Sequence, residues 1–439
     1  MHDRPKGKIL ERIDALFLIS IAFMVVLPDG SALPLLVFGL WGIFKAFHGK
    51  EAGFTNLVTF WLAEARRCVL AVVLVIFVLG NSFLLALHAA SSSEYEQLIP
   101  FILFPFATWL FVLRPVSLRI FSLGVAIAAI SSGLFALVQV LWFEMPHESR
   151  ASGWMANPIH FGHLCVLLAV YCLVGLLSQS DRTSSRSILI LYLGFILSLL
   201  GAVLSGSKSS WIAFAATALY LGVVVLRTQG LGWKMLVKSI LGVFLLFTFF
   251  VFVSPSSKRL QIFQNSISNL TAAVLEADKP LNIEALGLDP SVNDRIVQYQ
   301  MSAQLIVRHP WIGISRPDIS LEQKMRVANG EPGFKRVYRH IHSEYLDTLV
   351  NRGVLGFVLL TSMFFVLLFA VRETVKRKSF DSNVLFPSQT NLLRTSTLLL
   401  FAFMAMFDIL LSRISVMAPG LFVIAYCLGM GTTSCQHRD

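Results

Sequence analysis

The chain has 439 residues, of which 56% are hydrophobic and only 14% are charged, and its mean hydropathy is +0.72. This apolar share is well above that of a soluble domain, so water is not the main solvent of the folded chain. The net charge of +11 needs no nucleic-acid partner, because basic loops beside anionic lipid headgroups account for it.

Apolar runs long enough to cross a bilayer recur along the whole sequence. No ten-residue segments alternate between polar and apolar residues, which argues against a barrel and for helices. We therefore predict an all-α polytopic integral membrane protein of about twelve transmembrane helices. The predicted spans are 14–28, 31–47, 67–90, 98–114, 116–142, 158–178, 186–206, 209–226, 237–254, 353–372, 393–412 and 415–431. No small-residue cleavage site follows the first two, so we expect no removable signal peptide.

The distribution of Lys and Arg predicts the orientation, because short cytoplasmic loops retain basic residues. With the N-terminus inside, most of the 36 basic residues fall in inside segments or in the long segment 255–352. An even number of helices with both termini in the cytoplasm fits this pattern. We accordingly divide the chain into transmembrane helices 1–9 (1–254), a large, partly helical periplasmic loop (255–352), and helices 10–12 with a short cytoplasmic tail (353–439).

The long loop contains none of the five cysteines, which are Cys68, Cys165, Cys172, Cys427 and Cys435. It also has no pair of carboxylates in an Asp-x-Asp arrangement. A disulfide framework or a cysteine metal site is therefore not expected in this loop.

Only three basic residues fall in the short outside segments, namely Arg150, Lys208 and Arg413. A Lys or Arg at membrane depth costs about 2.5 to 3.5 kcal/mol to insert, so it usually faces a cavity or an anionic partner. Near a helix end the side chain can also extend to the headgroups. Because all three lie at outer helix ends on one side, we favour a shared anionic ligand.

The surroundings of these cations differ. Arg150 is followed by Asn157-Pro158, which predicts a helix start. Lys208 lies in a small, hydroxyl-rich turn whose backbone N–H groups form a ready anion site at a helix N-terminus. The alternative is a plain tight turn with an interfacial Trp. Arg413 follows Asp408, so a local ion pair is the competing interpretation.

In the long loop, Asp289-Pro290-Ser291 resembles a helix entry. An amphipathic helix is predicted from Arg295 to Arg308, ended by the sequence His309-Pro-Trp-Ile-Gly313. Arg295 opens this helix, and Asp294 beside it offers an exposed pairing of little energetic value. The basic stretch 324–339, which includes Arg339, is either a solvated face or a phosphate-binding patch.

His342 lies just before a helix that Ser343 is expected to cap. A neutral imidazole at this position is a competent general base. The alternative is a purely structural histidine. His340 and Tyr345 are the candidates for supporting residues.

In combination, these motifs resemble the O-antigen ligase/polymerase superfamily. The resemblance is carried by Arg150-Ala-Ser-Gly with Asn157-Pro, the Ser-Gly-Ser-Lys208 turn, Arg295, His309-Pro-Trp-Ile-Gly, and His342-Ser-Glu-Tyr-Leu with Gly353-Val-Leu-Gly. It extends from about residue 145 to 372. It implies a GT-C-like membrane glycosyltransferase.

The resemblance implies glycosyl transfer from a polyprenyl-diphosphate donor at the periplasmic face of the bacterial inner membrane. In the ligase branch, O-antigen on undecaprenyl diphosphate is transferred to a sugar hydroxyl of the lipid A core, with no metal or other cofactor. The catalytic histidine and arginine match His342 and Arg295, while Lys208, Arg150, Arg413 and Arg339 are expected to bind the diphosphate. Lys208 stands where the family has an arginine, so it keeps the charge but loses the bidentate fork.

Three other functions fit parts of the pattern. An O-antigen polymerase would use the same donor but another polyprenyl-linked glycan as acceptor, and a protein O-oligosaccharyltransferase would use a protein. A lipid-linked glycan transporter would explain many helices with buried cations. It would, however, place charge and broken helices at mid-membrane, whereas the polar signals here gather on one side.

Overall fold

The computed structural model describes residues 16–21, 30–48, 53–142, 150–155, 157–178, 184–229, 290–331, 334, 336–338, 340–379, 389–410 and 413–436. Every regular element within these ranges is a helix. In chain order they are η1 (Gly30–Ala32), α2 (Leu33–His48), α3 (Phe54–Leu62), α4 (Ala65–Leu87), α5 (Ser92–Tyr95), η2 (Glu96–Leu98), α6 (Ile99–Leu113), α7 (Leu118–Trp142), α8 (Pro158–Leu177), α9 (Ser185–Leu204), α10 (Lys208–Gln229), α13 (Pro290–Arg308), α14 (Arg316–Ala328), α15 (Glu344–Ser379), α16 (Gln389–Phe407) and α17 (Ile414–Gln436).

Eight helices in the described ranges are long and apolar enough to cross a membrane. They are α4, α5 to α6, α7, α8, α9, α10, the first part of α15, and α16, while α2 and α17 supply shorter apolar helices. The prediction of an all-α polytopic membrane protein is confirmed. The predicted span 237–254 and most of 14–28 lie outside the described residues, so the count of about twelve remains a prediction.

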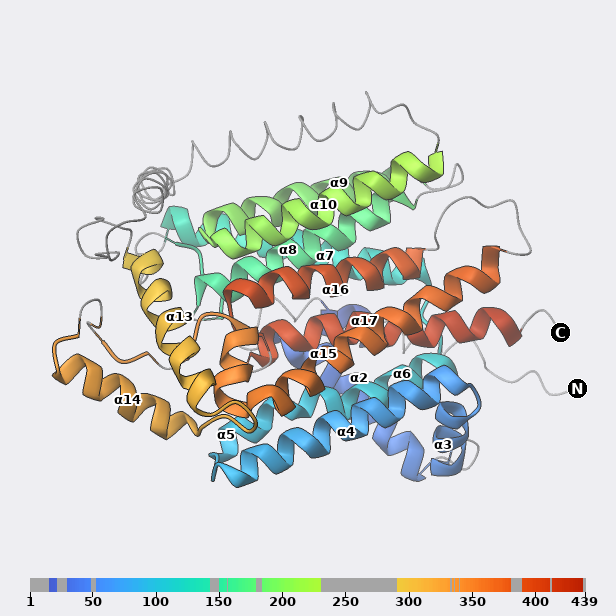
Figure 1. Cartoon of the computed structure of the whole chain (residues 1–439). Coiled ribbons are helices and arrows are strands. Elements are labelled where there is room, and N and C mark those ends of the chain that lie inside the picture. Colours follow the sequence, from blue (N-terminus) through green and yellow to red (C-terminus); the bar gives the residue numbers. More distant parts are fainter. Residues whose placement is uncertain are drawn as a thin grey trace, which may run out of the picture.

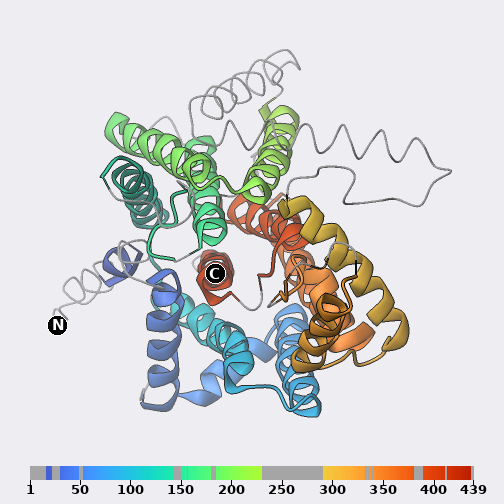
Figure 2. The ribbon, with the colours of Figure 1, turned by 90° about the vertical axis from the view of Figure 1, so that its left-hand side faces the viewer.

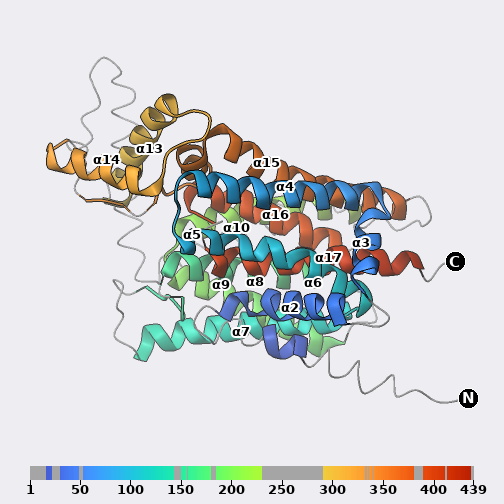
Figure 3. The ribbon, with the colours of Figure 1, turned by 90° about the horizontal axis from the view of Figure 1, so that it is seen from below.

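The apolar helices run side by side, and α13 and α14 cover one end of the bundle (Figures 1 and 3). α17 ends at the opposite end (Figure 1). Seen from the end with α13 and α14, α17 lies near the centre of the ring of helices (Figure 2). α8 is also central: 83% of its apolar 18-residue stretch is buried, compared with 33% for the corresponding stretches of α4 and α10. The outer helices expose apolar side chains such as Val72, Leu79 and Phe83, a surface that suits lipid rather than water.

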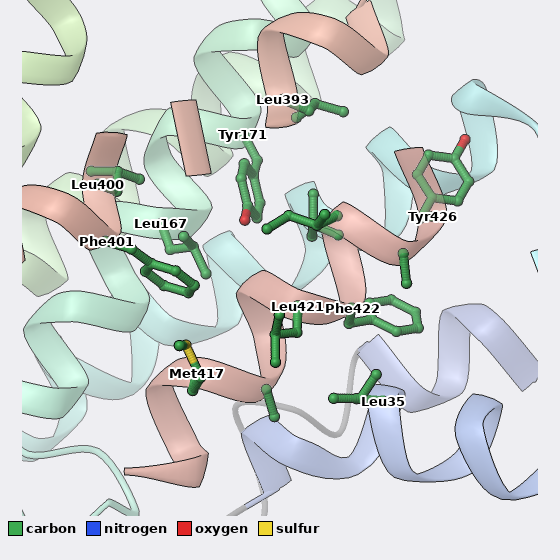
Figure 4. Close-up of a cluster of buried hydrophobic side chains, with 14 of the residues drawn as sticks. Leu35, Leu167, Tyr171, Leu393, Leu400, Phe401, Met417, Leu421, Phe422 and Tyr426 are labelled. Carbon is green, nitrogen blue, oxygen red and sulfur yellow. The ribbon is translucent and has the colours of Figure 1, made fainter. Parts of the chain in front are cut away.

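Side chains of α17, including Met417, Leu421 and Phe422, form the core with those of α8 and α16 (Figure 4). Aromatic rings fill much of this core; the ring of Tyr426 stacks on that of Phe121 with centroids 4.3 Å apart. Such offset aromatic contacts add to the stability that burial provides. The core therefore fixes the central helices, on which the polar residues at the end covered by α13 and α14 depend.

The long loop is more helical than the sequence predicts. α13 begins at Pro290, within the predicted helix entry, and ends at Arg308 as expected. α14 was not predicted at all; the hydroxyl of Ser315 caps it by accepting from the backbone N–H of Asp318. α14 is amphipathic rather than apolar, which is why hydropathy alone did not reveal it.

The helix predicted after Ser343 and the span predicted at 353–372 form one element, α15, which begins at Glu344 and has a kink at Gly353. Gly353 has φ 60°, and the 309–313 turn packs directly on it, with Gly313 at φ 72° on the other side. The backbone N–H groups of Val354 and Leu355, which the kink releases, donate to the carbonyls of Pro310 (2.8 Å) and Trp311 (3.2 Å). The His309–Gly313 motif and the Gly353 motif thus contact each other through their backbones. A Cβ at Gly353 would prevent this close approach.

We expect Gly353→Ala to lower the free energy of unfolding by about 2 kcal/mol or more, because the left-handed backbone and the Trp311 carbonyl both oppose a Cβ. Gly330→Ala is the matched control, since Gly330 has φ 65° with no atom within 4 Å of an added Cβ; it should cost about 1 kcal/mol. Thermal unfolding of both variants in the same detergent measures the difference. An equal loss in the two variants would contradict the proposed backbone overlap.

Candidate functional site

The backbone of His342 is held by α13. The side-chain carbonyl of Gln298 accepts from the N–H of His342 at 3.1 Å, and the hydroxyl of Tyr299 donates to its carbonyl at 2.9 Å. One residue on, the carbonyl of Ser343 accepts from the N–H of Asp347 at 2.8 Å, which starts α15. Ser343 therefore stands at the predicted helix start, with its main chain making the bond that begins the helix.

The imidazole of His342 faces a buried carboxylate. Its Nδ1 lies 3.9 Å from Oδ1 of Asp408, whose side chain is only 4% exposed, while the His342 side chain is 29% exposed. One edge of the ring is thus turned to the carboxylate, and part of the ring remains accessible from outside.

Asp408 follows the end of α16 and also faces α8. Its Oδ2 lies 3.4 Å from Nε2 of His163 and 3.8 Å from Nε2 of His160. Glu344, the first residue of α15, accepts from the N–H of Leu410 at 2.8 Å and donates its own N–H to the carbonyl of Asp408 at 3.1 Å. These bonds tie the segment carrying Asp408 to the helix that follows His342.

His340 and Arg413 lie at the same place. Nη2 of Arg413 is 3.4 Å from Nε2 of His340, and the rings of His340 and His342 are 5.3 Å apart between centroids. Burial, with the positive charge of Arg413 acting in the same direction, lowers the pKa of His340 to about 4. His340 is therefore neutral near pH 7, and the lasting positive charge beside it belongs to Arg413.

Arg295 does not pair with Asp294 as the alternative interpretation required. The carboxylate of Asp294 instead accepts from Arg336 at 2.6 Å and from the hydroxyl of Tyr338. Arg295 has no hydrogen bond or ion pair to another residue within the described ranges. It lies one turn before Tyr299 on α13, hence on the face that contacts His342. Burial raises the pKa of Tyr299, and the nearby charge of Arg295 opposes this rise.

Arg150 and Lys208 come together at the Ser-Gly-Ser-Lys turn. Nε of Arg150 donates to the carbonyl of Ser205 at 2.8 Å, and α10 begins at Lys208. Asn157 caps α8 as predicted, its side chain accepting from the N–H of Ile159. Arg150 therefore satisfies the C-terminal end of α9 and also brings its charge next to the Lys208 turn.

The other predicted residues have different surroundings. The hydroxyl of Tyr345 donates to the carbonyl of Ala402 at 3.1 Å, so it fastens α15 to α16. In the basic stretch, Arg326 is bound by Glu322 and Gln304 at 2.7 and 2.8 Å, a structural role. Arg339 lies outside the described residues.

A partly buried ion-pair network supports the site from the side of α14. Arg316 donates to Glu94 at 3.1 Å and to Asp347 at 2.9 Å, and the second oxygen of Asp347 accepts from the N–H of Ile341 at 3.2 Å. The charge of Asp347 raises the pKa of Arg316, and Glu94 adds to the rise. The segment just before His342 is thereby fixed to two neighbouring elements.

The sequence interpretation missed the roles of His160 and His163, and it considered Asp408 only as a partner for Arg413. A signal was present, since two histidines three residues apart at the start of a span lie on one helix face and are polar groups at membrane depth. In the part of the chain that the structure describes, no group of three or more His, Cys, Asp or Glu side chains is arranged to hold a metal ion.

The fold and site define a polytopic, all-α membrane protein with a polar centre of histidines, a buried carboxylate and cations at one end of its helix bundle. Residues 193–361 match the family model described as O-antigen ligase, which confirms the resemblance to the O-antigen ligase/polymerase superfamily of membrane enzymes. Lys208, Arg295 and His342 lie inside the matched residues. The comparison with curated proteins gave no match.

Proposed function

We propose that the chain is an O-antigen ligase, which transfers the glycan of undecaprenyl-diphosphate-linked O-antigen to a sugar hydroxyl of the lipid A core. The observation that carries this proposal is the imidazole of His342 facing buried Asp408 (3.9 Å) within a segment that matches the O-antigen ligase model. The site would face the periplasm of the bacterial inner membrane, with both chain termini in the cytoplasm.

His342 is the proposed general base. Its Nδ1 faces Asp408, which leaves Nε2 for the acceptor, and a carboxylate on the far side of an imidazole orients the ring and stabilises the positive charge it gains. As the acceptor oxygen attacks the anomeric carbon, its proton passes to Nε2. The bond from that carbon to the diphosphate oxygen breaks, and the bonding electron pair leaves with the diphosphate. A single displacement of this kind inverts the anomeric carbon.

Arg295, Lys208, Arg150 and Arg413 are the proposed stabilisers of the leaving diphosphate. Cations aimed at developing negative charge in a site that excludes water supply a large part of such catalysis. Arg295 is the strongest candidate because it has no ion pair within the described ranges and lies on the His342 face of α13. Arg339 remains a proposed member of this group, and His340 and Tyr345 remain proposed supporting residues.

The test of the activity is a product analysis with the purified full-length chain, labelled undecaprenyl-diphosphate-linked glycan and lipid A-core acceptor. We expect label on the lipid A core and release of undecaprenyl diphosphate. Longer lipid-linked glycans would indicate a polymerase, and label on an added protein acceptor would indicate a protein ligase. Movement of unchanged donor between leaflets of proteoliposomes would indicate a transporter.

His342→Ala should lower the ligation rate by about 10²- to 10⁴-fold, the usual contribution of a general base. The rate is measured with purified lipids at equal amounts of folded protein, checked by gel filtration in detergent. A rate near that of the unsubstituted chain would show that the base is another group.

Arg295→Ala should raise KM for the donor or lower kcat by at least about tenfold, and Arg295→Lys should recover only part of the loss, because lysine lacks the bidentate fork. Arg308→Ala is the matched control on the same helix, since Arg308 is a largely exposed arginine 3.6 Å from Glu322. We expect this control to retain its activity. Equal effects at the two positions would assign Arg295 to the protein surface rather than to the donor site.

A further inference from the structure

His163 is a fully buried polar side chain in the central helix of the bundle. Its Nδ1 lies 2.8 Å from the hydroxyl of Ser210, and its Nε2 lies 3.4 Å from Oδ2 of Asp408. A buried polar group without good partners lowers stability by about 1 to 3 kcal/mol. The position of His163 therefore calls for a reason beyond packing.

Ser210, which contacts Nδ1 of His163, is joined by hydrogen bonds to the turn that carries Lys208. The hydroxyl of Ser210 donates to that of Ser207 at 2.7 Å, and Ser207 in turn lies 3.2 Å from the hydroxyl of Ser209. α8 sits directly on this turn, because a Cβ at Gly162 would overlap the side chains of Ser207 and Ser210. The close approach at Gly162 holds the next residue, His163, opposite Ser210.

Asp408, which faces Nε2 of His163, also faces His342. Oδ1 of Asp408 faces His342 and Oδ2 faces His163, so the two oxygens are divided between the two histidines. Nε2 of His163 and Oδ2 of Asp408 are both buried, and neither makes a hydrogen bond within the described ranges, although the two atoms are only 3.4 Å apart. His160, which is 3.8 Å from the same oxygen, is the other charged or titratable neighbour from α8.

We propose that His163 is a positioning residue for the transfer reaction: both of its ring N–H groups donate, Nδ1 to Ser210 and Nε2 to Asp408, and the charged ring so fixes the carboxylate that orients His342. This inference rests on the proposed function. It also links the general base to the turn with Lys208 through one continuous chain of side chains. The position of His342 relative to the Lys208 turn is then fixed, although the two come from distant parts of the sequence.

Two amide substitutions separate the two contacts of His163. His163→Gln places its amide near the former Nε2 and can still donate to Asp408, whereas His163→Asn places its amide near the former Nδ1 and reaches only Ser210. We expect His163→Gln to keep most of the ligation rate. His163→Asn and His163→Ala should lose about tenfold or more in kcat, as small misplacements of a reacting group do, with KM for both lipids nearly unchanged.

A double-mutant cycle tests whether His163 acts through Asp408. In an Asp408→Asn background, His163→Ala should cost little further activity, because the carboxylate it positions is already absent. Tyr171→Phe is the control on the same helix; it removes a buried hydroxyl that lies 2.9 Å from Thr397 and should leave the ligation rate unchanged.

Equal activities of the Gln and Asn variants, or additive losses in the cycle, would overturn the inference and assign His163 to the fold. His342→Ala, measured alongside, separates this outcome from a failure of the proposed function. If His342→Ala is inactive while the His163 variants behave additively, only the positioning role is wrong. If His342→Ala is active, the assignment of the general base itself fails.

Discussion

The buried carboxylate of Asp408 holds the polar end of this protein together. Its oxygens face His342, His163 and His160 at 3.9, 3.4 and 3.8 Å, and its backbone carbonyl accepts from Glu344. A carboxylate side chain that is 4% exposed in a membrane protein is costly unless its charge meets donors. Those donors come from α8 and from the start of α15, so the ends of three central helices must meet for the charge to be tolerated.

The loop helices add a second constraint, on the backbone of His342. Gln298 and Tyr299 of α13 bind both main-chain groups of this residue, and the Arg316 to Asp347 pair fixes the segment before it. The kink at Gly353 completes the arrangement, because the turn after α13 supplies the carbonyls that the broken helix needs. A base held on all these sides is preorganised, which is what rate enhancement by a positioned group requires.

Much of the fold could be predicted because it depends on hydropathy alone. The spans of α4, α6 to α10 and α16 lie close to their predicted limits, and Asn157 caps α8 as its sequence indicated. α14 could not be found this way, since its stripe of apolar residues is short and it crosses no bilayer. The helix after Ser343 was indicated by the sequence, but its kinked junction with the apolar span at Gly353 was not, because that junction depends on carbonyls of the 309–313 turn.

By itself the sequence determined the membrane helices, the resemblance to a family, and the candidates Arg295 and His342. Hydropathy and short motifs depend only on residues that are close together in the chain. Only the tertiary structure decided which partner each charged group has. Asp294 binds Arg336 rather than Arg295, and Asp408 meets histidines far from it in the chain. The physical reason is that charged and polar groups act over a few ångströms, and which of them come within that range depends on how distant helices pack.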